Sequence, residues 1–167
     1  IEETLKFSVV KLRVLRDKEF DEPVDAMIYM VISALGFATV ENVLFARSAF
    51  QTALQEGFEN VLARFLGATL LHTLASGIIG FFIAKAILKK GHHRGYLAQG
   101  FLIALTLHTL FNMLMLELPS RQAPVVVGLL LLPMAYIVGR AFQSLRLKVF
   151  QPVTANFQFK TWQKNPS

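Results

Sequence analysis

The sequence predicts an all-α, polytopic transmembrane helix bundle with four full spans and part of a fifth at the N-terminus. Of the 167 residues, 54% are hydrophobic and only 17% are charged, whereas soluble domains carry roughly 25% charged residues. Mean hydropathy is +0.49. Four apolar windows of about 20 residues can each cross a hydrocarbon core of about 30 Å: 24–46, 62–88, 96–118 and 124–145. We therefore expect the lipid bilayer to surround most of the chain.

The first 15 residues have a helical pattern but reach only about 22 Å at 1.5 Å per residue. We expect this segment to be the cytoplasmic part of a span that begins upstream of Ile1. The acidic pair Asp21 and Glu22, followed by Pro23, then favours the start of the next helix. Acidic groups stabilise a helix N-terminus, and proline fits the first turn.

Positive charge alternates between the connections and indicates the orientation in the membrane. Lys and Arg are concentrated at 11–18, 85–94 and 140–164. In 47–64 and 117–122 basic residues are few, and acidic residues offset their charge. Because cytoplasmic loops carry the excess of Lys and Arg, the rich segments belong in the cytoplasm. The chain is therefore expected to be a multi-pass protein of the cell membrane with a cytoplasmic C-terminus.

Two parts of the chain differ in composition. Residues 1–146 contain all the apolar windows, whereas the tail 147–167 places aromatic residues among polar ones, which is typical of a membrane interface. We therefore expect a transmembrane domain followed by a cytoplasmic or interfacial tail.

Composition also excludes some chemistry. Cysteine is absent, so neither a disulfide framework nor a thiol nucleophile is available. The formal net charge of +6 is consistent with anchoring at the anionic inner leaflet. No basic stripe has interleaved stacking aromatics, so nucleic acid is not an expected partner.

Polar side chains inside the apolar windows are the main functional candidates, because hydrocarbon penalises ionisable groups by at least about 2.5 kcal/mol. At helical rise, Glu41 and Asn112 lie roughly 7 Å from the outer ends of their spans. His72 and His108 lie roughly 12 to 13 Å from those ends. Side chains from three helices are therefore expected to meet at one depth, in a single hydrated pocket.

The N-terminal segment adds two carboxylates to this level. If its helix leaves the bilayer near residues 11–16, Glu2 and Glu3 lie roughly 14 to 20 Å above the cytoplasmic end. Lys6 follows Glu3 by three residues, so it shares a helix face with this carboxylate. We expect Lys6 to pair with a carboxylate or to donate to bound substrate.

Helical phase predicts which residues support the site. Phe37 shares a face with Glu41. Ser76 belongs with His72 to a stripe of mostly small residues, which lets a neighbouring helix approach closely. His72 is therefore expected to face protein rather than lipid. Asn42, next to Glu41, either supports the site or bridges two helices.

Such a pocket is typical of a water-activating site. A carboxylate can take a proton from water, a histidine can hold that water or stabilise an oxyanion, and Asn112 can donate to a carbonyl oxygen as it becomes negative. Alternatively, the site could hold a single divalent ion such as zinc, with an open position for water. Its ligands would then come from His72, His108, Glu3 and Glu41. The residues leave both schemes open, with or without a metal cofactor.

Four sequence elements resemble the motifs of the PrsW family of intramembrane proteases and occur in that family's order: EETLK at 2–6, DAMIYMVISALGFATVENVLF at 25–45, LLHTLASG around His72 and HTLFN at 108–112. The resemblance extends to about Leu145. The elements are also similar to the wider superfamily of CAAX-type prenyl proteases, where a histidine often stands at the position of Glu41. The glutamate here favours the PrsW family.

The resemblance implies a multi-span endopeptidase, with residues 1–146 as its protease domain. It would cleave single-span, membrane-anchored proteins near the extracytoplasmic face, as characterised members do in the first cut of an anti-sigma factor. The family has been described both as metallopeptidases and as metal-free glutamate-type enzymes. Matched motif by motif, the implied catalytic residues are Glu2, Glu3, Glu41, His72, His108 and Asn112.

Two other classes of function are compatible with the same polar residues. Buried carboxylates and imidazoles form proton relays in proton-coupled transporters and channels, although these proteins usually show repeated architecture and broken helices near the midplane. The remaining alternative is an inactive scaffold that binds membrane proteins.

Overall fold

The computed structural model describes residues 1–15, 17, 20–49, 58–89, 93–118 and 122–147. Over these residues the chain is helical and contains no strand, which confirms the predicted all-α fold. The elements in order are α1 (Glu2–Val9), the π-helical turn η1 (Val10–Val14), α2 (Asp25–Ala49), α4 (Phe58–Leu88), α5 (His93–Glu117) and α6 (Ala123–Arg146).

Four of the described helices, α2, α4, α5 and α6, are long and apolar enough to cross a membrane, as the sequence predicts. The segment 1–15 is helical as expected, with α1 passing directly into η1. The predicted tail lies outside the described residues from position 148 onward, so the proposed division at residue 146 stays a prediction.

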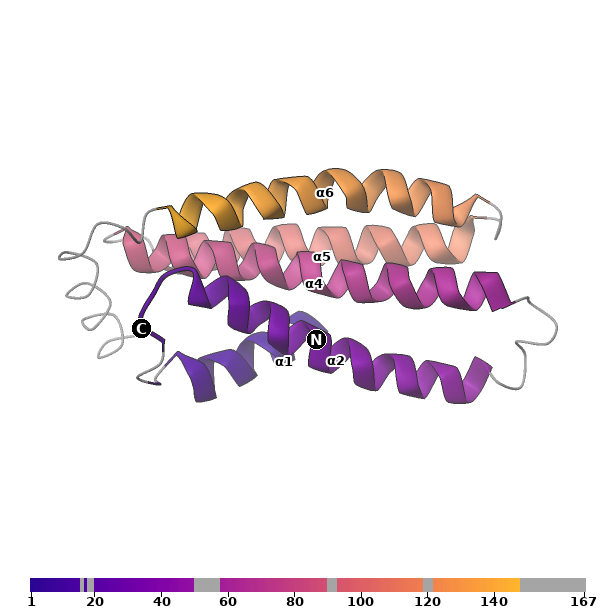
Figure 1. The fold of residues 1–167 in the computed structure, drawn as a ribbon, viewed down its shortest axis with the longest axis horizontal. Coiled ribbons are helices and arrows are strands. Elements are labelled where there is room, and N and C mark those ends of the chain that lie inside the picture. The colour runs from indigo at the N-terminus through magenta and orange to yellow at the C-terminus, as the bar shows by residue number, and fades with distance from the viewer. Residues whose placement is uncertain (16, 18–19, 50–57, 90–92, 119–121, 148–167) are drawn as a thin grey trace.

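Helix α4 is the centre of the bundle. It packs against α1, α2, α5 and α6, and Figure 1 shows α5 and α6 along one side of it and α1 with α2 along the other. Within its most apolar window 56% of α4 is buried, against 11% to 22% for α2, α5 and α6. The outer faces of those three helices are therefore available to lipid, while α4 has the largest share of side chains that face protein.

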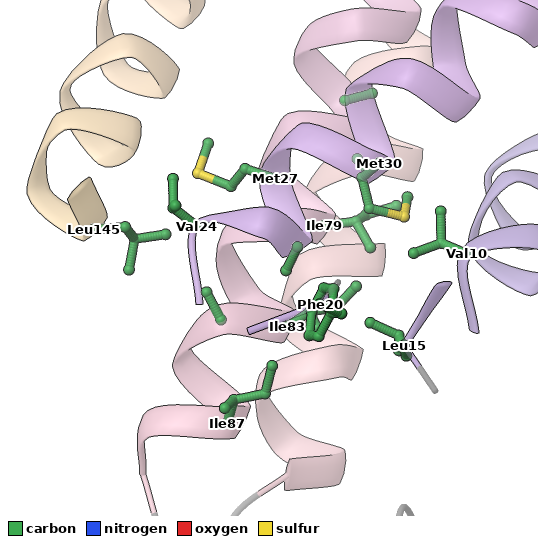
Figure 2. Packing of buried hydrophobic residues seen from close by; sticks show 14 residues of the cluster. Val10, Leu15, Phe20, Val24, Met27, Met30, Ile79, Ile83, Ile87 and Leu145 are labelled. Atoms are coloured by element: carbon green, nitrogen blue, oxygen red, sulfur yellow. The ribbon is translucent and has the colours of Figure 1, made fainter. Parts of the chain in front are cut away.

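A hydrophobic cluster fixes the part of the bundle in which α1 and η1 end. It joins η1, the connection before α2, the start of α2, the second half of α4 and the end of α6. Because lipid tails are as apolar as these side chains, such helices associate through close packing rather than through the hydrophobic effect. Figure 2 labels ten of its members: Val10, Leu15, Phe20, Val24, Met27, Met30, Ile79, Ile83, Ile87 and Leu145.

Small residues on α4 let α2 approach it closely. A Cβ atom added at Gly80 would lie 2.6 Å from the carbonyl oxygen of Ala26 and 2.6 Å from the Cα of Met27. The helix backbones are therefore in direct contact at this point. Ser76 and Ala84, one turn away on either side, are fully buried. The small-residue stripe of α4 is thus a helix-packing surface, as its spacing predicts.

This contact predicts that Gly80→Ala destabilises the protein by about 1 to 3 kcal/mol, because the methyl group forces the two backbones apart. Gly36→Ala is the matched control, since nothing lies within 4 Å of a Cβ atom there and alanine is the better helix former by about 1 kcal/mol. Thermal unfolding in detergent would measure both variants. Equal melting of Gly80→Ala and the unsubstituted protein would contradict the close approach.

Candidate active site

The site begins in α1, where Glu3 and Lys6 form a buried ion pair. The Nζ atom of Lys6 donates to Oε1 of Glu3 over 2.6 Å, with each side chain no more than 2% exposed. Ser76 on α4 donates to the other carboxylate oxygen over 3.0 Å. The predicted pairing of Lys6 with a carboxylate is confirmed, and α4 completes it.

His72 on α4 connects this ion pair to α2. Its Nδ1 lies 2.7 Å from Nζ of Lys6, and its Nε2 lies 2.5 Å from Oε2 of Glu41. The ring of Phe37 packs edge-on against the imidazole, with 5.5 Å between centroids, and lies 4.7 Å from the ammonium of Lys6. Phe37 and Glu41, one turn apart on α2, therefore both contact His72.

His108 on α5 faces the two carboxylates of α1. Its Nε2 lies 3.3 Å from Oε2 of Glu2, and its Nδ1 lies 3.6 Å from Oε1 of Glu3. The imidazoles of His72 and His108 are 5.1 Å apart between centroids. Two histidines and three glutamates, from α1, α2, α4 and α5, therefore form one polar cluster.

A cavity of about 130 Å³ adjoins this cluster between α2, α4 and α5. The volume admits a few water molecules, each of which occupies roughly 30 Å³ in the liquid. Its wall is partly polar and partly apolar. The polar residues are Glu41, Asn42, His72, His108 and Asn112, and the apolar residues are Phe45, Phe65, Ala68, Leu71, Phe111, Met115 and Leu116. The predicted hydrated pocket thus has a counterpart in the structure.

Two asparagines, Asn42 and Asn112, line this cavity and differ in their contacts. Asn112, one turn after His108 on α5, lines the wall directly. Asn42 also lines it but donates from Nδ2 to Oγ1 of Thr69 over 2.9 Å. Asn42 therefore bridges α2 and α4, and both interpretations of this residue drawn from the sequence are compatible with its position.

Two residues near the site, Ser33 and Thr69, are not among those predicted from the sequence. Ser33 on α2 donates to the backbone carbonyl of Lys6 over 3.1 Å and so attaches α1 to α2. Thr69 receives the hydrogen bond from Asn42. A signal exists for each, because Ser33 lies one turn before Phe37 and Thr69 lies three residues before His72, on the faces that carry the site.

The donor set fits a divalent ion. Glu2, His72 and His108 each offer one ligand atom, and these atoms lie within 4.8 Å of one another. A carboxylate and two imidazoles are a common zinc-ligand set with room for water. In addition, Oε2 of Glu2 is buried without a hydrogen-bond partner among the described residues. Of the four predicted ligands, His72 and His108 belong to this group, and the third member is Glu2. The other two predicted ligands have different contacts: Glu3 contacts Lys6, and Glu41 contacts His72.

The charges of the cluster also favour a cation. The cluster contains three carboxylates, those of Glu2, Glu3 and Glu41, and one ammonium, that of Lys6, which contacts Glu3. Two negative charges therefore remain uncompensated when both imidazoles are neutral. A divalent ion would balance them, and burial makes such compensation important.

The structure thus places carboxylates and imidazoles beside a cavity that is lined by three of the candidate membrane spans. The sequence model of one protein family, described as PrsW family intramembrane metalloprotease, matches residues 1–139. The chain belongs to the PrsW family, as the sequence elements indicate.

Three relatives illustrate the similarity, and each carries the name Protease PrsW. The protein of Geobacillus kaustophilus is 38% identical over 116 residues, which is 70% of this chain and 48% of the relative. That of Clostridioides difficile is 30% identical over 119 residues, with the same two coverages. That of Bacillus subtilis is 34% identical over 86 residues, 52% of this chain and 36% of the relative.

The chain spans about half the length of the first two relatives. No solved structure matches it.

The buried ion pair predicts a large cost for removing one partner. Glu3→Gln leaves the Lys6 ammonium buried beside a neutral amide, and we expect a loss of about 3 to 5 kcal/mol of stability. Glu117→Gln, at the exposed end of α5, is the matched control and should change stability little. Thermal unfolding in detergent would compare them. Equal stability of the two variants would contradict the ion pair.

Proposed function

We propose that the protein is an intramembrane endopeptidase that hydrolyses peptide bonds of membrane-anchored proteins near the extracytoplasmic face. The observation that carries this proposal is the contact of 2.5 Å between His72 and Glu41 in the wall of a cavity shared with His108. A carboxylate held by an imidazole beside space for water is the arrangement that general-base hydrolysis needs.

Glu41 is the proposed water-activating base. Its side chain is 47% exposed, unlike the buried carboxylate of Glu3, so it can reach a water molecule in the cavity. One of its oxygens contacts Nε2 of His72. This contact orients the carboxylate, whose other oxygen can take the proton from water. The water oxygen is then directed at a carbonyl carbon of the bound peptide.

His108 and Asn112 are the proposed partners of the carbonyl oxygen. They lie one turn apart on α5 and both line the cavity, opposite the α2 face that carries Glu41. Donors arranged in this way stabilise the negative charge that develops on the oxygen during attack. Glu41 can then deliver the proton that it took from water to the leaving amine. Glu2, whose Oε2 lies 3.3 Å from Nε2 of His108, orients that imidazole.

Glu2, His72 and His108 would hold a divalent ion in this site. When bound, such an ion would polarise the scissile carbonyl or lower the pKa of its bound water. The donor set and the family's description as metalloproteases support this assignment, as does Oε2 of Glu2, which has no hydrogen-bond partner among the described residues. Zinc is the ion that this combination of ligands suits best.

The substrate is proposed to be a single-span membrane protein that enters sideways. Helices α2 and α5 both pack on α4 but have little contact with each other, and the cavity lies between them. Its apolar wall suits a hydrophobic side chain next to the scissile bond. With a cytoplasmic C-terminus, as the positive charges predict, the site opens toward the extracytoplasmic leaflet, where an anti-sigma factor is a suitable substrate.

The proposal predicts that Glu41→Gln lowers the cleavage rate at least about 100-fold, because the amide keeps the shape of the side chain but cannot take a proton. Thr39→Val is the control on the same helix, since Thr39 bonds only its own helix backbone at Leu35 among the contacts described. Cleavage of a single-span reporter by the full-length protein in liposomes is the measurement.

The same liposomes separate the rival functions. A reporter cut equally well by Glu41→Gln and the unsubstituted protein would exclude Glu41 as the base. Proton flux that depends on Glu41, without any cleavage, would instead identify a transporter. Neither flux nor cleavage, with retained reporter binding, would identify a scaffold.

The metal assignment predicts one divalent ion per chain in the purified full-length protein, and loss of cleavage after chelation. His108→Ala should lower the metal affinity by more than the roughly 10- to 100-fold that loss of an outer-shell partner costs, because it removes one of the three proposed ligands. His93→Ala, outside the site, is the control. Elemental analysis would give the metal content, and full activity of a metal-stripped preparation would exclude the metal-dependent scheme.

A further inference from the structure

Lys6 is at the centre of a chain of contacts that joins three helices. Its ammonium lies 2.6 Å from Oε1 of Glu3 and 2.7 Å from Nδ1 of His72. His72 continues the chain through Nε2 to Glu41, 2.5 Å away. The order along the chain is therefore carboxylate, ammonium, imidazole, carboxylate, running from α1 through α4 to α2.

The chemistry of these groups defines the tautomer of His72. An ammonium group has three donors and no acceptor, so Nδ1 of His72 must accept from Lys6. A neutral imidazole that accepts at Nδ1 carries its hydrogen on Nε2. The Nε2–H group then donates to Glu41, which presents its carboxylate to the cavity. Lys6 on α1 thus controls an imidazole 66 residues away in the sequence.

The same nitrogen faces the proposed metal site. Nδ1 of His72 lies 3.9 Å from Oε2 of Glu2, the oxygen without a hydrogen-bond partner among the described residues. The other ring nitrogen is engaged with Glu41. One lone pair cannot serve the ammonium of Lys6 and a metal ion at once. The two cations are therefore alternatives at Nδ1.

We propose that Lys6 is a positioning residue that holds His72 as the Nε2–H tautomer and competes with a divalent cation for Nδ1. This inference rests on the proposed function only through the assignment of the metal ligands. It applies to the site whether or not the protein cleaves a given substrate.

The surroundings of Lys6 are suited to this exchange. Its side chain is 2% exposed, and Ser33 holds its backbone carbonyl, so the residue itself stays in place. The four-carbon stem is flexible and the ammonium is a compact charge. Withdrawal from Nδ1 can leave the ion pair with Glu3 intact, so the lysine remains neutralised when a metal ion binds.

The test is a cobalt titration of the metal-free, full-length protein in lipid nanodiscs, followed by visible absorption. Lys6→Met removes the ammonium and keeps an apolar stem, so it should raise the affinity for Co²⁺ about 10- to 100-fold. Lys6→Arg keeps the positive charge and the donors and should bind Co²⁺ within a few-fold of the unsubstituted protein. Lys85→Met is the control, because Lys85 lies over Phe81 and Phe82, outside the cluster.

A second measurement needs no substitution of Lys6. Nitrogen NMR of ¹⁵N-histidine-labelled, metal-free protein should show His72 with its hydrogen on Nε2 and an unprotonated Nδ1, assigned by loss of the signal in His72→Gln. This experiment remains valid if Lys6→Met does not fold.

Several outcomes would overturn the inference. They are a His72 hydrogen on Nδ1, an unchanged or weaker Co²⁺ affinity in folded Lys6→Met, or no Co²⁺ binding by either protein. A reporter that stays uncut, together with tighter Co²⁺ binding by Lys6→Met, would reject the protease and retain the positioning role of Lys6.

Discussion

The buried ion pair between Glu3 and Lys6 is the constraint on which the rest of the site depends. Neither charge can be solvated inside a bilayer, and an ion pair that leaves water needs further hydrogen bonds to offset its desolvation. Ser76 and His72 supply them from α4. The short helix α1 is therefore held at one depth and one rotation by polar contacts, and that rotation also directs Glu2 toward His108.

Helix α4 can support this polar layer because the two parts of its length pack differently. In its second half, Gly80 admits the backbone of α2, and Ile79 and Ile83 fill the cluster shown in Figure 2. One turn earlier the same face carries Ser76 and then His72, both almost fully buried. Close packing at one end thus brings α2 near enough for Glu41 to contact His72. The apolar and polar parts of the fold are consequently one arrangement.

The spans and several of the polar residues that meet beside the cavity could be predicted from the sequence because the bilayer imposes strong rules on both. Hydrocarbon thickness sets the length of an apolar window, and the cost of an ionisable group there makes Glu41 and His72 candidates for the site. The lateral order and rotation of the helices do not follow from depth and phase. The contacts of Lys6 with His72 and of Ser33 with α1 therefore emerge only from the structure.

The two histidines are predicted from the sequence to lie at a similar depth, but their neighbours differ. His72 lies between an ammonium and a carboxylate, whereas His108 has a carboxylate near each ring nitrogen. Nδ1 of His72 thus faces a donor, whereas both ring nitrogens of His108 face acceptors. In the proposed mechanism His72 orients Glu41 by donating from Nε2, and His108 donates to the developing oxyanion. This asymmetry arises because Lys6 contacts His72, so a single lysine on α1 gives the two imidazoles different surroundings.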